Sequence, residues 1–276
     1  MSIDFRVRAP VPGYRSAEFF NNFEDVEQRA ARFDARPSPW SRTFSLADLI
    51  AEMDACGVTQ AVVPVRKGCG GSNEDLLTLF AAWPGRFLGL AGIAPMQGME
   101  AALAEIERYV ISGPCSGIAL EPAFDPTPWF VDDEAVFPLY DFCQNANVPV
   151  IFTYGGIMTP GLAWYSPLAL DKVAGLFPRL KIALCHGGWP YVTEFSEIAF
   201  NRGNVWLAPD MYMLGAPGSG DYVRAANGLL YDRMIFASAS PIISITDAVW
   251  HYTHCGVRRD RLPFLMEHNA RAFLGL

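Results

Sequence analysis

Short apolar runs alternate with amphipathic segments along the whole chain, and this alternation constrains the fold more than any other feature. The apolar runs have the length of buried strands. The segments between them repeat apolar residues at the i, i+3, i+4, i+7 spacing of one helical face, as at Val136, Leu139, Tyr140 and Cys143. The pattern therefore predicts strands that are each followed by a helix.

The predicted strands cover Ile3–Val7, Gln60–Val65, Phe87–Ile93, Gly117–Leu120, Val148–Phe152, Lys181–Cys185, Val205–Ala208 and Met234–Ala237. The predicted helices include Leu46–Ala55, Asn73–Ala82, Met99–Val110, Glu134–Ala146, Tyr191–Phe200, Tyr222–Leu229 and Ala248–His254. Roughly eight such units in ~250 residues are typical of an α/β fold of the (β/α)8 TIM-barrel type. A doubly wound open sheet is the alternative, but no Gly-x-Gly-x-x-Gly turn follows the first strand.

Two segments fall outside the repeating units. Ala9–Thr43, rich in Pro, Arg and Phe, is too long for a tight first turn, so we expect a long loop insertion after the first strand that folds over the barrel mouth. The closing segment Arg259–Leu276 predicts a terminal helix that packs against the barrel. No low-complexity linker divides residues 1–276, and we expect a single domain.

Charge and composition exclude several classes of partner. The net charge of -8 argues against a nucleic-acid partner, which needs a basic face. No apolar run approaches the ~20 residues of a membrane span, so we expect no membrane partner. The six cysteines show no Cys-x-x-Cys spacing and indicate reduced thiols in a cytoplasmic protein. The apolar loops allow a homodimer, but composition does not require one.

Arg6 and Arg8 stand one residue apart on the first predicted strand, so their side chains should project to the same face. A guanidinium is always charged and has no lone pair to offer a metal. Burying two guanidiniums is costly unless each is paired. Asp4 and Glu121 are candidate partners, and an anionic ligand is the other explanation, because guanidiniums bind carboxylate or phosphate bidentately. We expect these arginines to bind a small anionic organic substrate.

Five motifs occur in order along the chain: Ile3-Asp4-x-Arg6-x-Arg8, Val148–Thr153, Phe177–Gly188, Phe236–Pro241 and Glu267–Ala270. Together they resemble the amidohydrolase superfamily, and most closely the amidohydrolase-2 branch that includes aminocarboxymuconate-semialdehyde decarboxylase. The resemblance covers nearly the whole chain and implies a TIM barrel. It also implies hydrolase or lyase chemistry, including decarboxylation.

The resemblance further implies which positions hold a metal in that branch. Its first strand carries Ile-Asp-x-His-x-His, where this chain has Arg6 and Arg8, and its other ligands align with Thr153, His186 and Ala239. Only His186 keeps a ligand side chain. Zinc needs ~4 ligands drawn from His, Cys or carboxylate, and two local positive charges repel a cation. We therefore expect no metal and no other cofactor.

Three candidate catalytic residues follow predicted strands, where TIM barrels place their chemistry. His186 is a candidate general acid/base whose pKa the neighbouring arginines should lower, and a structural histidine bonded to a backbone carbonyl is the alternative. Asp210 and Glu121 are candidate proton-transfer partners or counter-charges, although capping a loop or helix explains them equally well. Cys185 precedes His186 on its strand, so we expect it to face the helices.

Further candidates for substrate binding lie in the loops at the barrel mouth. Arg66 follows the second predicted strand, and its alternative is a solvated loop charge. Tyr154 and Tyr165 follow the fifth, and their alternative is packing at the rim.

The sequence thus predicts a metal-independent hydrolase or lyase that acts on a small carboxylated, cyclic or aromatic substrate. The arginine pair would stabilise developing negative charge, and His186 would move the proton. Lactone or ester hydrolysis, decarboxylation and other C–C or C–O lyase reactions all fit. The alternative is a catalytically inactive homologue that serves as a ligand-binding or regulatory subunit. Loss of the ligand residues favours this alternative, and the clustering of two arginines opposes it.

Overall fold

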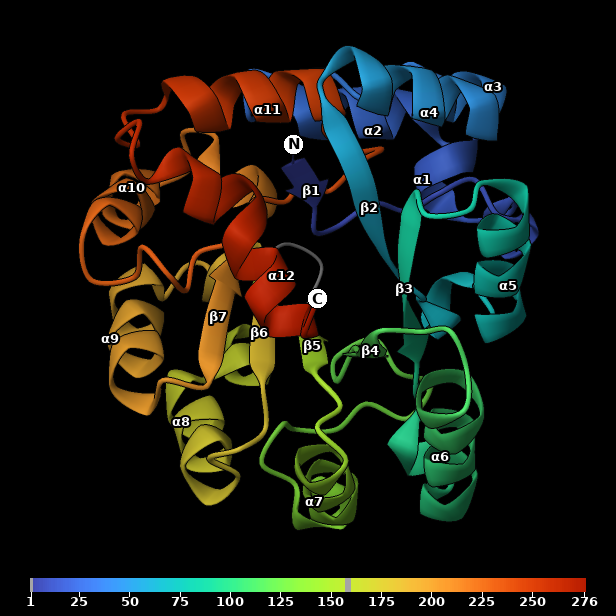
Figure 1. The fold of residues 1–276 in the computed structure, drawn as a ribbon, viewed down its shortest axis with the longest axis vertical. Coiled ribbons are helices and arrows are strands. Elements are labelled where there is room, and N and C mark those ends of the chain that lie inside the picture. The colour runs from blue at the N-terminus through green and yellow to red at the C-terminus, as the bar shows by residue number, and fades with distance from the viewer. Residues whose placement is uncertain (1, 157–159) are drawn as a thin grey trace.

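Seven parallel strands surround a common axis, with helices on their outer side (Figure 1). The computed structural model describes residues 2–156 and 160–276. Each strand pairs with the next one in chain order, as in a TIM barrel. The strands are β1 (Ser2–Asp4), β2 (Val58–Pro64), β3 (Phe87–Gly92), β4 (Gly117–Leu120), β5 (Val150–Thr153), β6 (Ile182–Cys185) and β7 (Val205–Ala208).

The eighth position of the barrel is filled by residues 234–240 without a regular strand. On one side, the amide of Ile235 donates to the carbonyl of Leu207 in β7 at 2.8 Å. On the other side, the amide of Phe5 donates to the carbonyl of Phe236 at 3.0 Å. The predicted strand Met234–Ala237 therefore lies where expected, but it makes only an isolated bridge, between Leu207 and Met234.

Helices cover the outside of the strands, and two of them, α4 and α5, have the predicted bounds. The helices are α1 (Glu18–Asn21), α2 (Phe23–Ala31), α3 (Trp40–Thr43), α4 (Leu46–Ala55), α5 (Asn73–Ala82), α6 (Met99–Ile106), α7 (Phe137–Asn145), α8 (Pro167–Leu176), α9 (Val192–Arg202), α10 (Ser219–Asn227), α11 (Ile245–His254) and α12 (Asn269–Leu274). Side-chain caps fix both predicted starts, because Ser45 and Ser72 each accept a hydrogen bond from the amide three residues on. The sequence did not predict α8.

Alternate residues of the strands fill the barrel interior with apolar side chains. This cluster includes Ile3, Phe5, Val62, Leu90, Ala119, Ile151, Ala183, Cys185, Trp206, Ala208, Ile235 and Ala237. Phe273 of α12 joins it, with its ring edge-on to Phe5 at 5.4 Å and to Trp206 at 5.5 Å. The terminal helix therefore closes one end of the barrel, as the sequence predicted.

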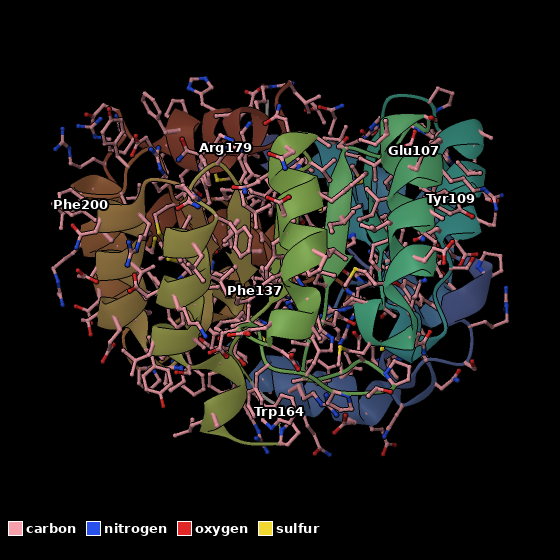
Figure 2. All side chains as sticks on the ribbon, turned by 90° about the horizontal axis from the view of Figure 1, so that it is seen from below. Glu107, Tyr109, Phe137, Trp164, Arg179 and Phe200 are labelled. Atoms are coloured by element: carbon pink, nitrogen blue, oxygen red, sulfur yellow. The ribbon has the colours of Figure 1, made fainter. Side chains whose placement is uncertain are left out.

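The 9–43 segment lies across the other end, where the blue helices of Figure 2 pass beneath the strands. It is largely helical, in α1 to α3, where the sequence indicated a loop. Asn22 caps α2 by accepting a hydrogen bond from the amide of Asp25. The segment also approaches the loop after β2 closely through its backbone, because a Cβ on Gly13 would lie 2.4 Å from the Gly70 carbonyl oxygen.

No helix among residues 2–156 and 160–276 combines the length and the apolar character needed to cross a membrane.

Candidate active site

A cavity of about 450 Å³ opens where the carboxyl ends of the strands meet the 9–43 segment. Arg6 and Arg8, which follow β1, both reach it, together with the predicted residues Arg66 and His186. Its other lining residues are Ser16, Ala17, Asp25, Val26, Arg29, Gly68, Cys69, Gly70, Phe124, Thr153, Met211 and Ile242. Cationic and apolar side chains thus share one enclosed space, which suits a small amphipathic anion.

Three residues at strand ends adopt left-handed backbone conformations: His186 (φ 67°), Asp210 (φ 46°) and Ala239 (φ 63°). Non-glycine residues seldom adopt this conformation, and such strain concentrates at functional sites. Cys185 points into the barrel interior together with Ala183, as the alternation of β6 requires. The expectation that Cys185 faces the helices was wrong because the left-handed backbone takes His186, rather than Cys185, out of this alternation. Burial raises the pKa of its thiol to about 11, which makes it an inert core residue.

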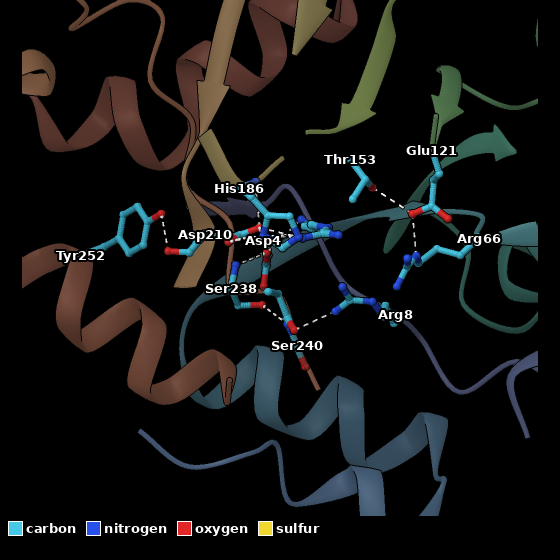
Figure 3. Close-up of polar contacts among 12 residues, drawn as sticks. Asp4, Arg8, Arg66, Glu121, Thr153, His186, Asp210, Ser238, Ser240 and Tyr252 are labelled. Atoms are coloured by element: carbon cyan, nitrogen blue, oxygen red, sulfur yellow. Dashed lines mark hydrogen bonds and ion pairs between the residues drawn. The ribbon is translucent and has the colours of Figure 1, made fainter. Parts of the chain in front are cut away.

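One guanidinium nitrogen joins the two predicted catalytic residues His186 and Asp210 (Figure 3). Arg6 Nη1 lies 2.7 Å from Asp210 Oδ2 and 2.9 Å from His186 Nε2. His186 Nδ1 lies 3.0 Å from Asp210 Oδ1. An ionised carboxylate can only accept, so this contact assigns the imidazole proton to Nδ1 and leaves Nε2 to accept from Arg6.

The electrostatics of this group favour a neutral imidazole. Burial and the charge of Arg6 lower the pKa of His186 to about 4, in the direction that the sequence predicted. Burial opposes ionisation of Asp210, but contacts with His186 and Arg6 overcome it and hold its pKa below the ordinary value. Near pH 7 the group therefore consists of a guanidinium, a carboxylate and an uncharged histidine.

Arg8 lies beside this group, and its Nη1 donates to the carbonyl of Ala239 at 3.0 Å. Burial and the charges of Arg6 and Arg66 lower its pKa to about 9. It remains a cation at neutral pH, but mutual repulsion raises the free energy of the empty cavity. An anionic ligand would relieve that repulsion.

Asp4, the last residue of β1, binds backbone amides next to the two arginines. Its Oδ1 accepts from the amide of Arg6 at 3.1 Å and from the amide of Ser238 at 2.9 Å. The first contact turns the chain at the end of β1, and the second ties β1 to the eighth position. Asp4 is therefore a structural residue, and the sequence was wrong to offer it as an arginine counter-charge.

Glu121 and Thr153 form a second polar group with Arg66. Glu121 Oε1 accepts from Arg66 Nε at 2.5 Å and from Thr153 Oγ1 at 2.9 Å. Glu121 does not line the cavity, whereas its two partners do.

The two predicted tyrosines lie away from the cavity lining. The Tyr154 hydroxyl donates to the carbonyl of Ser166, and its ring packs edge-on against Phe195. The Tyr165 ring packs against Tyr191. Their role in substrate binding stays a prediction without support from their positions.

The sequence missed the contribution of α2, which brings Asp25, Val26 and Arg29 to the cavity. Asp25 and Arg29 form an i,i+4 ion pair on this helix. The capping residue Asn22 and this charge spacing were the available signals.

A family model described as Amidohydrolase matches residues 23–276. The chain belongs to the amidohydrolase family. This amidohydrolase is also similar over its whole length to an uncharacterized TIM-barrel protein of Bordetella bronchiseptica, with 31% sequence identity and a TM-score of 0.93; the alignment covers 100% of this chain and 99% of that one.

Two decarboxylases share the fold with this amidohydrolase at lower identity. The 2,6-dihydroxybenzoate decarboxylase from Rhizobium is 17% identical with a TM-score of 0.70, over 99% of this chain and 98% of that one. A dihydroxybenzoic acid decarboxylase from Polaromonas, solved with bound manganese, is 18% identical with a TM-score of 0.71, over 100% and 97%. At this identity the likeness shows the barrel alone.

The residues of this amidohydrolase do not fit the metal that the Polaromonas structure holds. Within the described residues, no three His, Cys, Asp or Glu side chains lie together as a metal-binding group. The space between His186 and Asp210 is bridged by the Arg6 guanidinium, which has a fixed positive charge and no lone pair. A divalent ion there would lie beside the guanidinium of Arg6 and near that of Arg8. Neither of these cations can serve as a metal ligand.

Proposed function

We propose that this amidohydrolase is a metal-independent hydrolase or decarboxylase-like lyase that acts on a small carboxylated substrate, cyclic or aromatic, bound in the cavity. The observation that carries the proposal is the single Arg6 nitrogen shared between His186 and Asp210. It supports a site in which a guanidinium provides the positive charge near the reacting atoms.

Arg6 and Arg8 are the proposed substrate-binding pair. In the described part of the chain, the side-chain contacts of Arg6 all run through Nη1, so Nε and Nη2 keep their donors for a ligand. Asp210 holds the guanidinium in place before the ligand arrives, which reduces the entropy lost on binding. The same donors would stabilise negative charge that develops on a carbonyl oxygen or on the ring.

His186 is the proposed proton carrier, with Asp210 fixing its tautomer. When the contact between Nε2 and Arg6 Nη1 opens, Nε2 could take a proton from water or from the substrate, while Asp210 keeps the guanidinium in place. A conjugate acid with a pKa of about 4 returns its proton readily, which suits protonation of a leaving oxygen or of a carbon that has lost carbon dioxide.

The first experiment tests metal independence and anion binding together. Protein purified without added metal should contain well under one equivalent of metal and keep its activity after chelation. Arg8→Ala should weaken the binding of benzoate about 10-fold, as expected for a lost charge-assisted hydrogen bond. Arg258→Ala serves as the matched control, because Arg258 pairs with Asp260 on the surface. Stoichiometric, tightly bound metal would reject the proposal.

Turnover separates the enzyme from the inactive binding subunit. His186→Ala should lower the rate on a responsive aromatic acid or lactone by about 10² to 10⁴-fold, while benzoate affinity changes little. Wild-type protein that binds such acids tightly and converts none of them would favour the binding subunit.

A further inference from the structure

Glu121 lies behind Arg66 rather than in the cavity. Both hydrogen-bond donors, Arg66 Nε and Thr153 Oγ1, meet the same carboxylate oxygen, at 2.5 Å and 2.9 Å (Figure 3). Arg66 and Thr153 line the cavity, and Glu121 does not. A carboxylate in this position is separated from a ligand in the cavity by Arg66 and Thr153. It can act on a ligand only through its two neighbours.

Arg66 is held on three sides. Its backbone amide donates to the Tyr14 hydroxyl at 2.8 Å, its Nε donates to Glu121, and its guanidinium carbon lies 5.3 Å from the centre of the Phe124 ring. Among the residues that the structure describes, none forms a hydrogen bond or ion pair with Arg66 Nη1 or Nη2. These two nitrogens therefore remain as a two-pronged donor, the geometry that suits a carboxylate.

Glu121 also stabilises the charged form of Arg66 in this buried position. The Arg66 and Glu121 side chains are only 13% and 8% exposed. Burial opposes the charge of Arg66, but Glu121 overcomes that effect and raises the pKa of the guanidinium. Without the carboxylate, the charge of Arg66 would lose its ion-pair partner in a cavity that already holds the guanidiniums of Arg6 and Arg8.

We propose that Glu121 and Thr153 are positioning residues, which aim the free nitrogens of Arg66 at an anionic group of the substrate. The inference rests on the proposed binding of a carboxylate in this cavity. It gives Glu121 a role other than proton transfer. The three residues follow or end β2, β4 and β5, so three strands fix the direction of one guanidinium.

The test is a double-mutant cycle read by calorimetric titration with benzoate. Glu121→Gln keeps the shape and loses the charge, and should weaken binding about 10-fold when Arg66 is present. In an Arg66→Met background the same change should cost less than about twofold, because nothing remains to be positioned. Thr153→Val should give a smaller loss of the same kind, and Thr153→Ser should restore affinity. Glu267→Gln, which breaks an ion pair with Arg271 outside the cavity, is the matched control.

A second readout needs no ligand. Solvent exchange of the Arg66 Nε–H, followed by ¹⁵N NMR, should be slow in the wild type and faster in Glu121→Gln. Unfolding curves show whether each variant is folded. If Glu121→Gln does not fold, the same double-mutant cycle can be made with Thr153→Val and Arg66→Met.

Two results would overturn the inference: equal loss of affinity from Glu121→Gln in both backgrounds, or an unchanged Nε–H exchange rate. Loss of turnover in Glu121→Gln with wild-type affinity would make Glu121 a proton-transfer residue instead. A wild type that binds no benzoate, with Nε–H exchange that still responds to Glu121→Gln, would reject the anion site and leave the positioning of Arg66 intact.

Discussion

At the scale of single residues, Arg6 links a histidine to a carboxylate through one nitrogen, and the proposed function depends on this contact. The guanidinium is held 2.7 Å from Asp210 Oδ2, so its remaining donors already point in a fixed direction. A buried carboxylate that fixes a cation in advance lowers the cost of ordering the site on binding. The proposed chemistry depends on that preorganisation more than on the basicity of His186, which burial reduces.

The structural role of Asp4 can be tested through the pH dependence of the free energy of unfolding. Burial raises its pKa to about 7, and its Oδ2 finds no hydrogen-bond partner among the described residues. The unfolded chain ionises at a lower pH than the folded protein, so the free energy of unfolding should fall as pH rises from about 4 to about 7. Asp4→Asn should remove this slope and stabilise the protein at pH 8 by roughly 2–4 kcal/mol.

Urea unfolding between pH 4 and pH 8 measures the slope. Asp54→Asn is the control, because the Asp54 side chain is 61% exposed and pairs with Arg86 on the surface. If the slope persists in Asp4→Asn, another group is responsible for it.

At the scale of elements, the 9–43 segment is fixed to the loop after β2 by a close backbone approach. A Cβ on Gly13 would lie 2.4 Å from the Gly70 carbonyl oxygen, and backbone cannot move aside as a flexible side chain can. Gly13→Ala should therefore displace this segment from the cavity and weaken benzoate binding by about 10-fold, a cost near 1.4 kcal/mol.

Gly161→Ala is the matched control, because a Cβ there meets nothing within 4 Å. Hydrogen exchange of α2 should become faster in Gly13→Ala and stay unchanged in Gly161→Ala. Unchanged exchange and affinity in Gly13→Ala would show that the contact does not hold the segment.

The sequence predicted most elements because their apolar residues recur with helical or strand periods. The predicted first strand extended to Val7, whereas β1 ends at Asp4. There the Asp4 side chain accepts a hydrogen bond from the amide of Arg6, which is then not available to a neighbouring strand. The sequence also missed α8, which begins at Pro167, and the short helices of the 9–43 segment. The four-residue helices α1 and α3, like α8, depend on contacts with the rest of the barrel rather than on a strong local period. By contrast, α2 has local signals, because Asn22 caps it and its apolar residues share one face.

The candidate site was predictable where residues directly follow strands. His186, Asp210 and Arg66 follow β6, β7 and β2, and TIM barrels bring those ends together. Cys185 points inward with Ala183, as the alternation of β6 requires. The direction of His186 was not predictable, because its left-handed backbone breaks this alternation. The cavity residues of α2 were not predictable either, since their position depends on how a distant segment crosses the barrel.

At the scale of the whole molecule, one aromatic side chain, that of Phe273, closes the end of the barrel opposite the cavity. Phe273 is fully buried between Phe5 and Trp206. Phe273→Ala should lower the free energy of unfolding by about 3–5 kcal/mol, through lost burial and the cavity left behind. Leu276→Ala, at a residue that is 57% exposed, should change it by less than about 0.5 kcal/mol. Urea unfolding compares the two, and equal effects would show that α12 does not close the barrel.

Because residues 234–240 close the barrel, the closed barrel can form only after this late segment has been synthesised. The Arg8 guanidinium meets the carbonyl of Ala239, 231 residues further along the chain. At ~5–20 residues per second, a ribosome needs roughly 10–50 s to supply that partner after Arg8 has been made. For that interval Arg6 and Arg8 remain in water, and the proposed anion site can form only when residues 234–240 have emerged.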